Sequence, residues 1–253
     1  MATDSTQRFS NRVKDYIKYR PGYPTEIISY LQHTYHLAPG SLIADIGAGT
    51  GISSKLFLDA GYKVIGVEPN QEMHDAAVAL LKDRIDFSTT GGTAEATELD
   101  DHSVDAIVAG QAFHWFDREK AKAEFTRILR GKDIVALIWN ERLMKSDFEQ
   151  AYEALIHKYA RDYVAVDHRN VDPAGMEAFF SPHKVQLETF DNKQVFDAEG
   201  LLGRLSSSSY MPAHTDEAYA AMREELHRLF DRHQHNGHVT IHYTTKLYTG
   251  RLS

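Results

Sequence analysis

The strongest constraint on this chain is an apolar run that breaks into a glycine-rich turn and continues as a helical pattern. Leu42–Ile46 is apolar except for Asp45, and the turn that follows carries Gly47, Gly49 and Gly51. Glycine reaches positive φ at little cost, and a turn without side chains lets main-chain N–H groups face a ligand directly. A buried strand, a glycine turn and a helix in this order indicate an α/β fold that binds a nucleotide-like cofactor.

The glycine spacing separates two kinds of cofactor. The turn has the spacing G-x-G-x-G with Asp45 two residues ahead of it, whereas a dinucleotide site has G-x-G-x-x-G. A carboxylate at the tip of the strand repels a pyrophosphate and favours a ligand with an ammonium or a sulfonium. A second apolar strand, Tyr62–Val67, ends in Glu68, where such folds place a carboxylate that accepts hydrogen bonds from both ribose hydroxyls.

These segments resemble the class I S-adenosylmethionine-dependent methyltransferases. The resemblance rests on D-I-G-A-G-T-G (45–51), V-E-P-N (67–70), G-T-A-E (92–95) and V-D-A-I-V-A-G-Q-A-F-H-W-F (104–116). Together with Q-A-F-H-W-F, the motif Y-R-P-G-Y-P (19–24) is similar to the small-molecule branch called methyltransferase type 11, which includes trans-aconitate methyltransferases. The resemblance covers residues 8–140 and is thin beyond them.

The resemblance implies S-adenosyl-L-methionine as the cofactor. The main chain of the glycine turn would approach its methionyl part, Asp45 would supply negative charge near its ammonium, and Glu68 would bind its ribose. The other cofactor-binding residues that we expect are Tyr19, Arg20, Pro69, Met73, Ala94, Glu95, Gln111 and Ala112. Core packing is the alternative for Met73, and a solvated loop position is the alternative for Glu95.

The loop after the fourth predicted strand falls where doubly wound folds place their ligand crevice. Val104–Ala109 is an almost unbroken apolar run, typical of a strand buried on both faces, and a loop rich in aromatic residues follows. We expect Gln111 and His114 to line the crevice and Trp115 to anchor the loop in the core. Hydrogen-bonded packing is the alternative for the histidine. It would act as a general base only for an alcohol or amine acceptor, since a carboxylate is already ionised at pH 7.

The methyl acceptor is expected to meet residues from three parts of the chain. By analogy with the family, these are Arg20, His114, Trp115, Ser209 and Tyr210. The arginine would suit an anionic acceptor.

Alternating strand and helix patterns up to residue 140 predict five β-α units with right-handed crossovers. With the resemblance, they predict an α/β, Rossmann-like, doubly wound and mostly parallel seven-stranded sheet with an antiparallel edge strand and a helical cap insertion. Two later strand patterns, Val185–Phe196 and His238–Thr249, are expected to form an antiparallel edge pair, with the helices between them as a lid. A short amphipathic helix is expected over residues 8–17.

We expect one compact domain with two functional parts. Residues 1–140 would form an N-terminal lid arm and the cofactor-binding core, and residues 141–253 the substrate-cap helices and the last two strands.

Composition narrows the classes of partner. The 253 residues are 42% hydrophobic and 25% charged, as in soluble globular proteins, and no segment is apolar over the length of a membrane span. A polar start without a signal-peptide core favours the cytoplasm. A net charge of −8 argues against a nucleic-acid substrate.

The chain has no cysteine and 14 histidines, but it lacks the motif H-E-x-x-H, so no bound metal is expected. A monomer or a homodimer is expected.

The sequence therefore predicts an S-adenosylmethionine-dependent methyltransferase acting on a small molecule, with a carboxylate oxygen as one possible target. Three alternatives stay open: a protein or RNA methyltransferase, an NAD-dependent oxidoreductase, and a cofactor-binding protein without catalytic activity.

Overall fold

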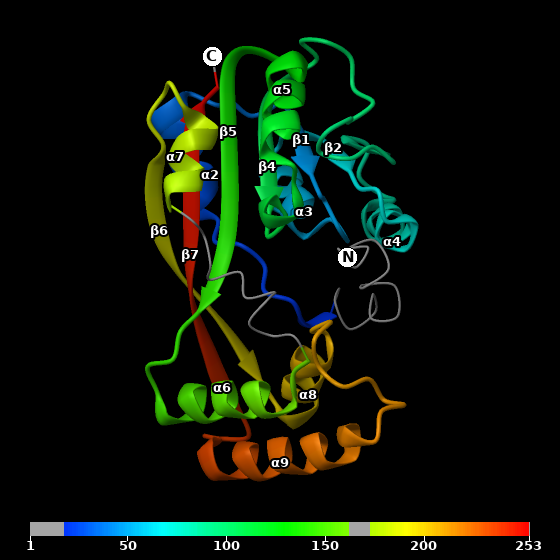
Figure 1. The fold of residues 1–253 in the computed structure, drawn as a ribbon, viewed down its shortest axis with the longest axis vertical. Helices are drawn as coiled ribbons and strands as arrows, with labels where there is room; N and C mark the ends of the chain where they lie inside the picture. Colours follow the sequence, from blue (N-terminus) through cyan, green and yellow to red (C-terminus); the bar gives the residue numbers. More distant parts are fainter. Residues whose placement is uncertain (1–17, 162–172, 253) are drawn as a thin grey trace.

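The computed structural model describes residues 18–161 and 173–252, so the helix expected over residues 8–17 lies outside the described residues. Its centre is a seven-stranded sheet in the order β3-β2-β1-β4-β5-β7-β6 (Figure 1). Strands β3 to β5 are parallel in this order, and β7 runs antiparallel to both of its neighbours. The strands are β1 Leu42–Ile46, β2 Lys63–Val67, β3 Phe87–Thr90, β4 Val104–Gly110, β5 Leu129–Arg142, β6 Gln186–Phe196 and β7 Val239–Arg251. The predicted fold class and the antiparallel pair at the edge are confirmed.

Helices cover both faces of this sheet. The described helices are α2 Glu26–Tyr35, α3 Ile52–Asp59, α4 Gln71–Leu81, the 3₁₀ turn η3 Phe113–Trp115, α5 Arg118–Ile128, α6 Asp147–Tyr159, α7 Pro173–Phe180, α8 Ala198–Ser206 and α9 Ala218–His233. Ile43 packs with α2 and α3, while its neighbour Ala44 packs with α5 and α7 on the opposite face. Both faces are therefore buried, which explains the unbroken apolar runs of the central strands.

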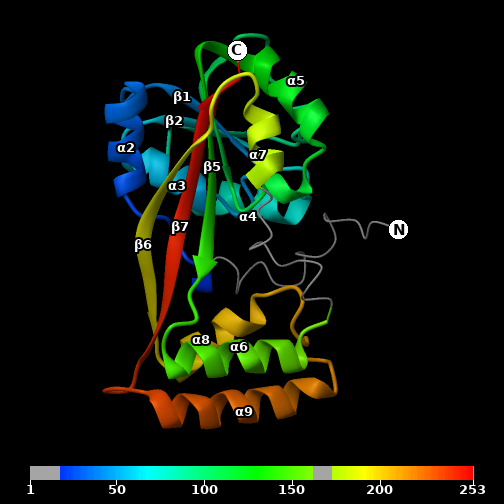
Figure 2. The same ribbon diagram turned by 60° about the vertical axis from the view of Figure 1, so that its left-hand side comes forward.

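A second layer lies at one end of the long strands β5, β6 and β7. Figures 1 and 2 both show α6, α8 and α9 gathered there, away from the short strands. They share a separate apolar core that includes Tyr152, Leu201 and Met222. We call this layer the cap. The expected lid helices between β6 and β7 are α8 and α9.

Helix α7 does not belong to the cap, although residues 141–253 were expected to hold the cap helices. It packs beside α5 on the sheet (Figure 2), where the rings of Phe179 and Phe113 lie 4.7 Å apart. Its apolar side chains fill the face of the sheet that α5 leaves uncovered.

Glu149 joins the cap to the sheet. Its carboxylate is 1% exposed and accepts hydrogen bonds from the N–H groups of Lys145, Ser146 and His242 at 2.9, 2.9 and 3.0 Å. Ser146 completes a capping box at the start of α6.

No helix of the described part of the chain combines the length and apolar character needed to cross a membrane.

Candidate active site

Two adjoining cavities lie at the carboxyl ends of β1 and β4. The outer cavity has a volume of about 240 Å³, and the inner cavity, between the sheet and the cap, has about 50 Å³. Both are lined by Gly47, Gly49, Gly110 and Gln111. The two cavities therefore meet at the glycine turn and the end of β4, the crevice that doubly wound folds use for ligands.

Glycine is required at each of the three positions of the turn for a different physical reason. Gly47 has a φ of +68°, and a Cβ there would lie 2.6 Å from the Cβ of Ala112. Gly49 has a φ of +56° and no atom within 4 Å of a Cβ, so its backbone faces open space. Gly51 starts α3 with a φ of +85°, and a Cβ there would lie 2.8 Å from Leu81 Cδ1. It is needed for packing and lines neither cavity.

Glu68 lines the outer cavity and stabilises the glycine turn by a hydrogen bond. One carboxylate oxygen accepts the N–H of Gly49 at 2.8 Å, and the other accepts the N–H of Asn70 at 2.9 Å. Burial raises the pKa of Glu68 despite these two bonds. A carboxylate offers about four lone-pair sites, so two remain for the hydroxyls of a sugar.

Asp45 lies behind the turn, with no exposed surface, and lines neither cavity. Its Oδ2 accepts hydrogen bonds from the hydroxyls of Ser53 and Ser54, both at 2.6 Å. Its Oδ1 is buried without a hydrogen-bond partner in the described structure, and burial raises the pKa of this carboxyl. Of these two serines, only Ser53 lines the inner cavity.

Six other expected residues meet in the lining of the outer cavity. They are Pro69, Met73, Ala94, Glu95, Gln111 and Ala112. Asn70 also lines it and caps α4 by accepting the N–H of Met73 at 2.9 Å.

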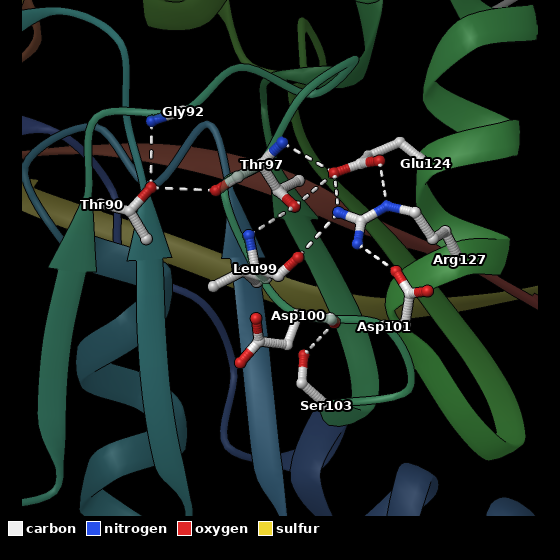
Figure 3. A network of polar contacts seen from close by, with 9 residues as sticks. All are labelled: Thr90, Gly92, Thr97, Leu99, Asp100, Asp101, Ser103, Glu124 and Arg127. Carbon is white, nitrogen blue, oxygen red and sulfur yellow. Dashed lines mark hydrogen bonds and ion pairs between the residues drawn. The ribbon is translucent and has the colours of Figure 1, made fainter.

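A polar network holds the loop that brings residues 93–95 to the outer cavity (Figure 3). Thr90 donates its hydroxyl to the carbonyl of Thr97 at 2.9 Å and accepts the N–H of Gly92 at 3.0 Å. Glu124 on α5 accepts the N–H of Thr97 at 2.8 Å and its hydroxyl at 2.6 Å. Arg127 donates to Glu124 and is the main reason that the pKa of Glu124 falls to about 2.

The loop after β4 corrects one expectation. Trp115 is 40% exposed and lines the outer cavity, whereas its neighbour Phe113 is 1% exposed and anchors the loop against Phe179 and Trp139. The 3₁₀ turn directs Phe113 inward and the tryptophan outward. His114 is exposed beside Trp115, with ring centroids 4.8 Å apart, and lines neither cavity.

The inner cavity contains three arginines. Arg20 donates to the carbonyl of Ser207 at 3.1 Å, Arg142 pairs with the buried carboxylate of Glu153, and the third is Arg204 on α8. Of these, the sequence pointed only to Arg20.

Five residues of the inner cavity's lining were missed from the sequence, the two arginines Arg142 and Arg204 together with Tyr23, Asn140 and Tyr243. One signal existed for Arg204, which follows Leu201 by three residues and so falls on the buried face of α8. For the others no local pattern distinguishes them.

Three expected residues lie in or beside the cap core instead of a cavity lining. Tyr19 is 9% exposed, and a Cβ at Gly203 on α8 would lie 2.0 Å from its ring. Tyr210 is buried in the cap, where burial raises the pKa of its hydroxyl but the charges of nearby arginines lower it overall. Ser209 lies beside it, half-buried.

A glycine turn after β1, an acid after β2 and an antiparallel β7 between β5 and β6 define the class I methyltransferase fold. Comparison with known families agrees, because residues 44–137 match the methyltransferase domain family. The match concerns this segment of the chain.

Curated proteins that the chain is similar to carry methyltransferase names. An uncharacterized methyltransferase of Mycobacterium tuberculosis is 37% identical over 139 residues, which are 55% of this chain and 54% of the relative. The chain thus spans about half the length of that relative. An uncharacterized methyltransferase of Schizosaccharomyces pombe is 28% identical over 247 residues, 95% of each chain.

Solved structures show the same fold. A protein from Anaeromyxobacter dehalogenans that bears the name of a type II methyltransferase has a TM-score of 0.69 at 20% identity, covering 92% of this chain and 98% of that one. Phosphoethanolamine N-methyltransferase 2 of Haemonchus contortus, bound to phosphomonomethylethanolamine and S-adenosylhomocysteine, has a TM-score of 0.57 at 14% identity, covering 98% of this chain and 60% of that one. The trans-aconitate branch stays a prediction.

Proposed function

We propose that this protein transfers the methyl group of S-adenosylmethionine to a small molecule, at a carboxylate oxygen. The observation that carries the proposal is the junction of the two cavities. An outer cavity of about 240 Å³, with a carboxylate at its wall, meets a small basic inner cavity at the open backbone of Gly49.

The residues present fit S-adenosylmethionine. Glu68 would accept hydrogen bonds from the ribose, and Met73 and Ala94 would contact the adenine. The N–H groups of the glycine turn would approach the methionyl part, with the negative charge of Asp45 behind them opposite its ammonium. Asp45 lines neither cavity, so we expect the ammonium to stabilise its ionised form through charge and without direct contact; its Oδ1 has no hydrogen-bond partner in the described structure.

The proposed methyl transfer requires the protein mainly to position the cofactor and the acceptor. When bound, the cofactor supplies an activated methyl group: a carboxylate oxygen forms the new C–O bond while the C–S bond breaks and its electron pair stays on sulfur. No proton leaves a carboxylate acceptor, and the described lining of the inner cavity contains no histidine or acid to take one. Orientation of the two reactants by the cavity walls can lower the barrier by roughly 7–11 kcal/mol.

The test is the substitution Glu68→Ala, with binding measured by titration calorimetry. Loss of a charged hydrogen-bond acceptor should weaken S-adenosylmethionine binding about tenfold to a hundredfold. Glu72→Ala is the matched control, because that glutamate is exposed one turn further along, on α4. Unchanged affinity in Glu68→Ala, or preferential binding of NAD by the wild-type protein, would contradict the proposal and favour the oxidoreductase alternative.

A further inference from the structure

Strand β6 forms an open edge of the sheet. It lies at one end of the strand order, and among the described residues only β7 pairs with it (Figures 1 and 2). With 11 residues it is much longer than β3, the strand at the opposite edge, which has four. An unpaired edge presents main-chain N–H and C=O groups that can bind a further strand.

The main-chain groups that point outward from β6 belong to its odd-numbered residues. The N–H of Lys193 donates to the side chain of Asn192 at 2.8 Å and not to β7. His242, which lies opposite Lys193 on β7, accepts the N–H of Leu143 at 2.9 Å, so its own groups point away from β6. Because such groups alternate in direction along an antiparallel strand, Asp191 faces the open edge together with Lys193.

The side chains of the odd-numbered residues form one exposed surface along this edge. Leu187 and Val195, near the two ends of the strand, are 52% and 55% exposed. Thr189, Asp191 and Lys193 lie between them and are exposed as well. Neither charged side chain has an ion-pair partner among the described residues. The edge therefore carries one acid and one base, two positions apart on the same face.

These two charges select one register for a second copy of β6. Only pairs of odd-numbered residues bring outward main-chain groups together across a two-fold axis. With Asn192 on the axis, Asp191 lies opposite the partner's Lys193, and Lys193 lies opposite the partner's Asp191. An axis at either charged residue would instead place like charges opposite each other, which is unfavourable.

The same register covers the exposed apolar side chains. Val195 lies opposite the partner's Thr189 and diagonally beside the partner's Leu187, within reach of both. Charges on an edge strand usually prevent pairing with another chain. Here an acid and a base alternate, so that one register turns both charges into ion pairs.

We propose that two copies of this protein pair through β6, antiparallel about a two-fold axis at Asn192, so that their two sheets become one. The inference goes beyond the proposed methyl transfer and does not depend on it. Both copies use the same strand, so the interface is closed and assembly stops at two. The axis adjoins the candidate active site, since Asn192 donates to the carbonyl of Gly22 at 2.9 Å, next to Tyr23 of the inner cavity.

The experiment reverses the charges and measures the mass in solution by sedimentation velocity across the micromolar range. The wild-type protein should dimerise. Asp191→Lys and Lys193→Asp each place two like-charged pairs across the axis, so each alone should weaken dimerisation about tenfold or more. An equimolar mixture of the two variants should regain the dimer, because each copy then meets the opposite charge. Asp231→Lys, at an exposed position on α9, is the matched control and should dimerise as the wild type does.

Introduced thiols test the register, because the chain has no cysteine. Asp191→Cys mixed with Lys193→Cys should give a disulfide-linked heterodimer on oxidation, whereas neither variant should cross-link alone. The Cα atoms of such a directly opposed pair lie about 5.5 Å apart, within the range that a disulfide spans. The second charged pair of this heterodimer stays intact.

Three results would overturn the proposal. One is a wild-type protein that stays monomeric throughout the micromolar range. Another is a dimer that survives both charge reversals, which would mean that the copies meet at a different surface. The third is a mixture of the reversed variants that stays monomeric. Failure to bind S-adenosylmethionine would reject the proposed function and would leave this inference standing.

Discussion

At the scale of a residue, Asp45 is a carboxyl group buried in the core with few hydrogen-bond partners. Its carboxyl has no exposed surface, two serine hydroxyls on one oxygen and no partner on the other among the described residues. Because burial raises its pKa, the folded state binds this proton more tightly than the unfolded state does. The ionised group therefore lowers stability, and the loss grows as the pH rises above the ordinary pKa of 3.8.

The substitution Asp45→Asn should raise the free energy of unfolding at pH 7 by about 1 kcal/mol while weakening S-adenosylmethionine binding about tenfold. The amide keeps the shape of the side chain and removes the buried charge. Urea unfolding at pH 7 and pH 3 should show a gain at the higher pH only, since the wild-type carboxyl is protonated at the lower. A stability loss at pH 7, or unaltered cofactor affinity, would show that the negative charge is not held for the ligand.

At the scale of an element, the loop after β3 owes its position to α5. Residues 93–95 line the outer cavity, but the groups that hold the loop are Thr97, Glu124 and Arg127, which lie outside that lining (Figure 3). Glu124 keeps its charge in acid, because the adjacent guanidinium lowers its pKa to about 2.

Glu124→Gln should weaken S-adenosylmethionine binding about threefold to tenfold, because the amide holds Arg127 and the loop less firmly. Glu119→Gln, an exposed position in the first turn of the same helix, is the control and should have no effect. The readouts are calorimetric affinity and hydrogen exchange of the amides at residues 92–97, which should quicken in the first variant alone. Equal exchange in both variants would mean that the loop is held by other contacts.

At the scale of the whole molecule, the long strands β5, β6 and β7 run from the sheet to the cap (Figure 1). One apolar core lies on each face of the sheet, and a third lies among α6, α8 and α9. Residues of both parts line the inner cavity. Glu149 is a polar connection between these parts, since it caps α6 and accepts the N–H of His242 on β7. Burial raises the pKa of Glu149, but its hydrogen bonds have the larger combined effect and lower the pKa to about 2.

Glu149→Gln should lower the free energy of unfolding by about 1.5–3 kcal/mol at pH 7, as for a hydrogen-bonded charged group. The depressed pKa means that the wild-type contribution is complete above the ordinary pKa of 4.5 and is lost as the pH falls through about 2. Chemical unfolding between pH 7 and pH 2 should therefore show a shallower acid slope in the variant. Glu224→Gln, which removes an exposed i,i+4 pair on α9, is the control; a matching loss there would indicate a general charge effect.

The sequence by itself determined the part of the fold that forms the outer cavity, because its signals are local. Apolar runs, the glycines of the turn and the acid after β2 depend on neighbouring residues alone, and the structure places Glu68, Met73, Ala94 and Gln111 together as expected. The error at Trp115 is also local in origin, since both aromatic residues of the loop are apolar and only the turn geometry of η3 decides which one points inward.

Only the tertiary structure decided the inner cavity. Arg20 meets Ser207 across 187 positions, and the arginine of α8 reaches the hydroxyl of Tyr243 across 39. Such contacts depend on how the cap docks on the long strands, and no periodicity within either segment encodes that docking. The sequence thus indicates the class of cofactor through its backbone turns, whereas long-range packing sets the charge of the inner cavity.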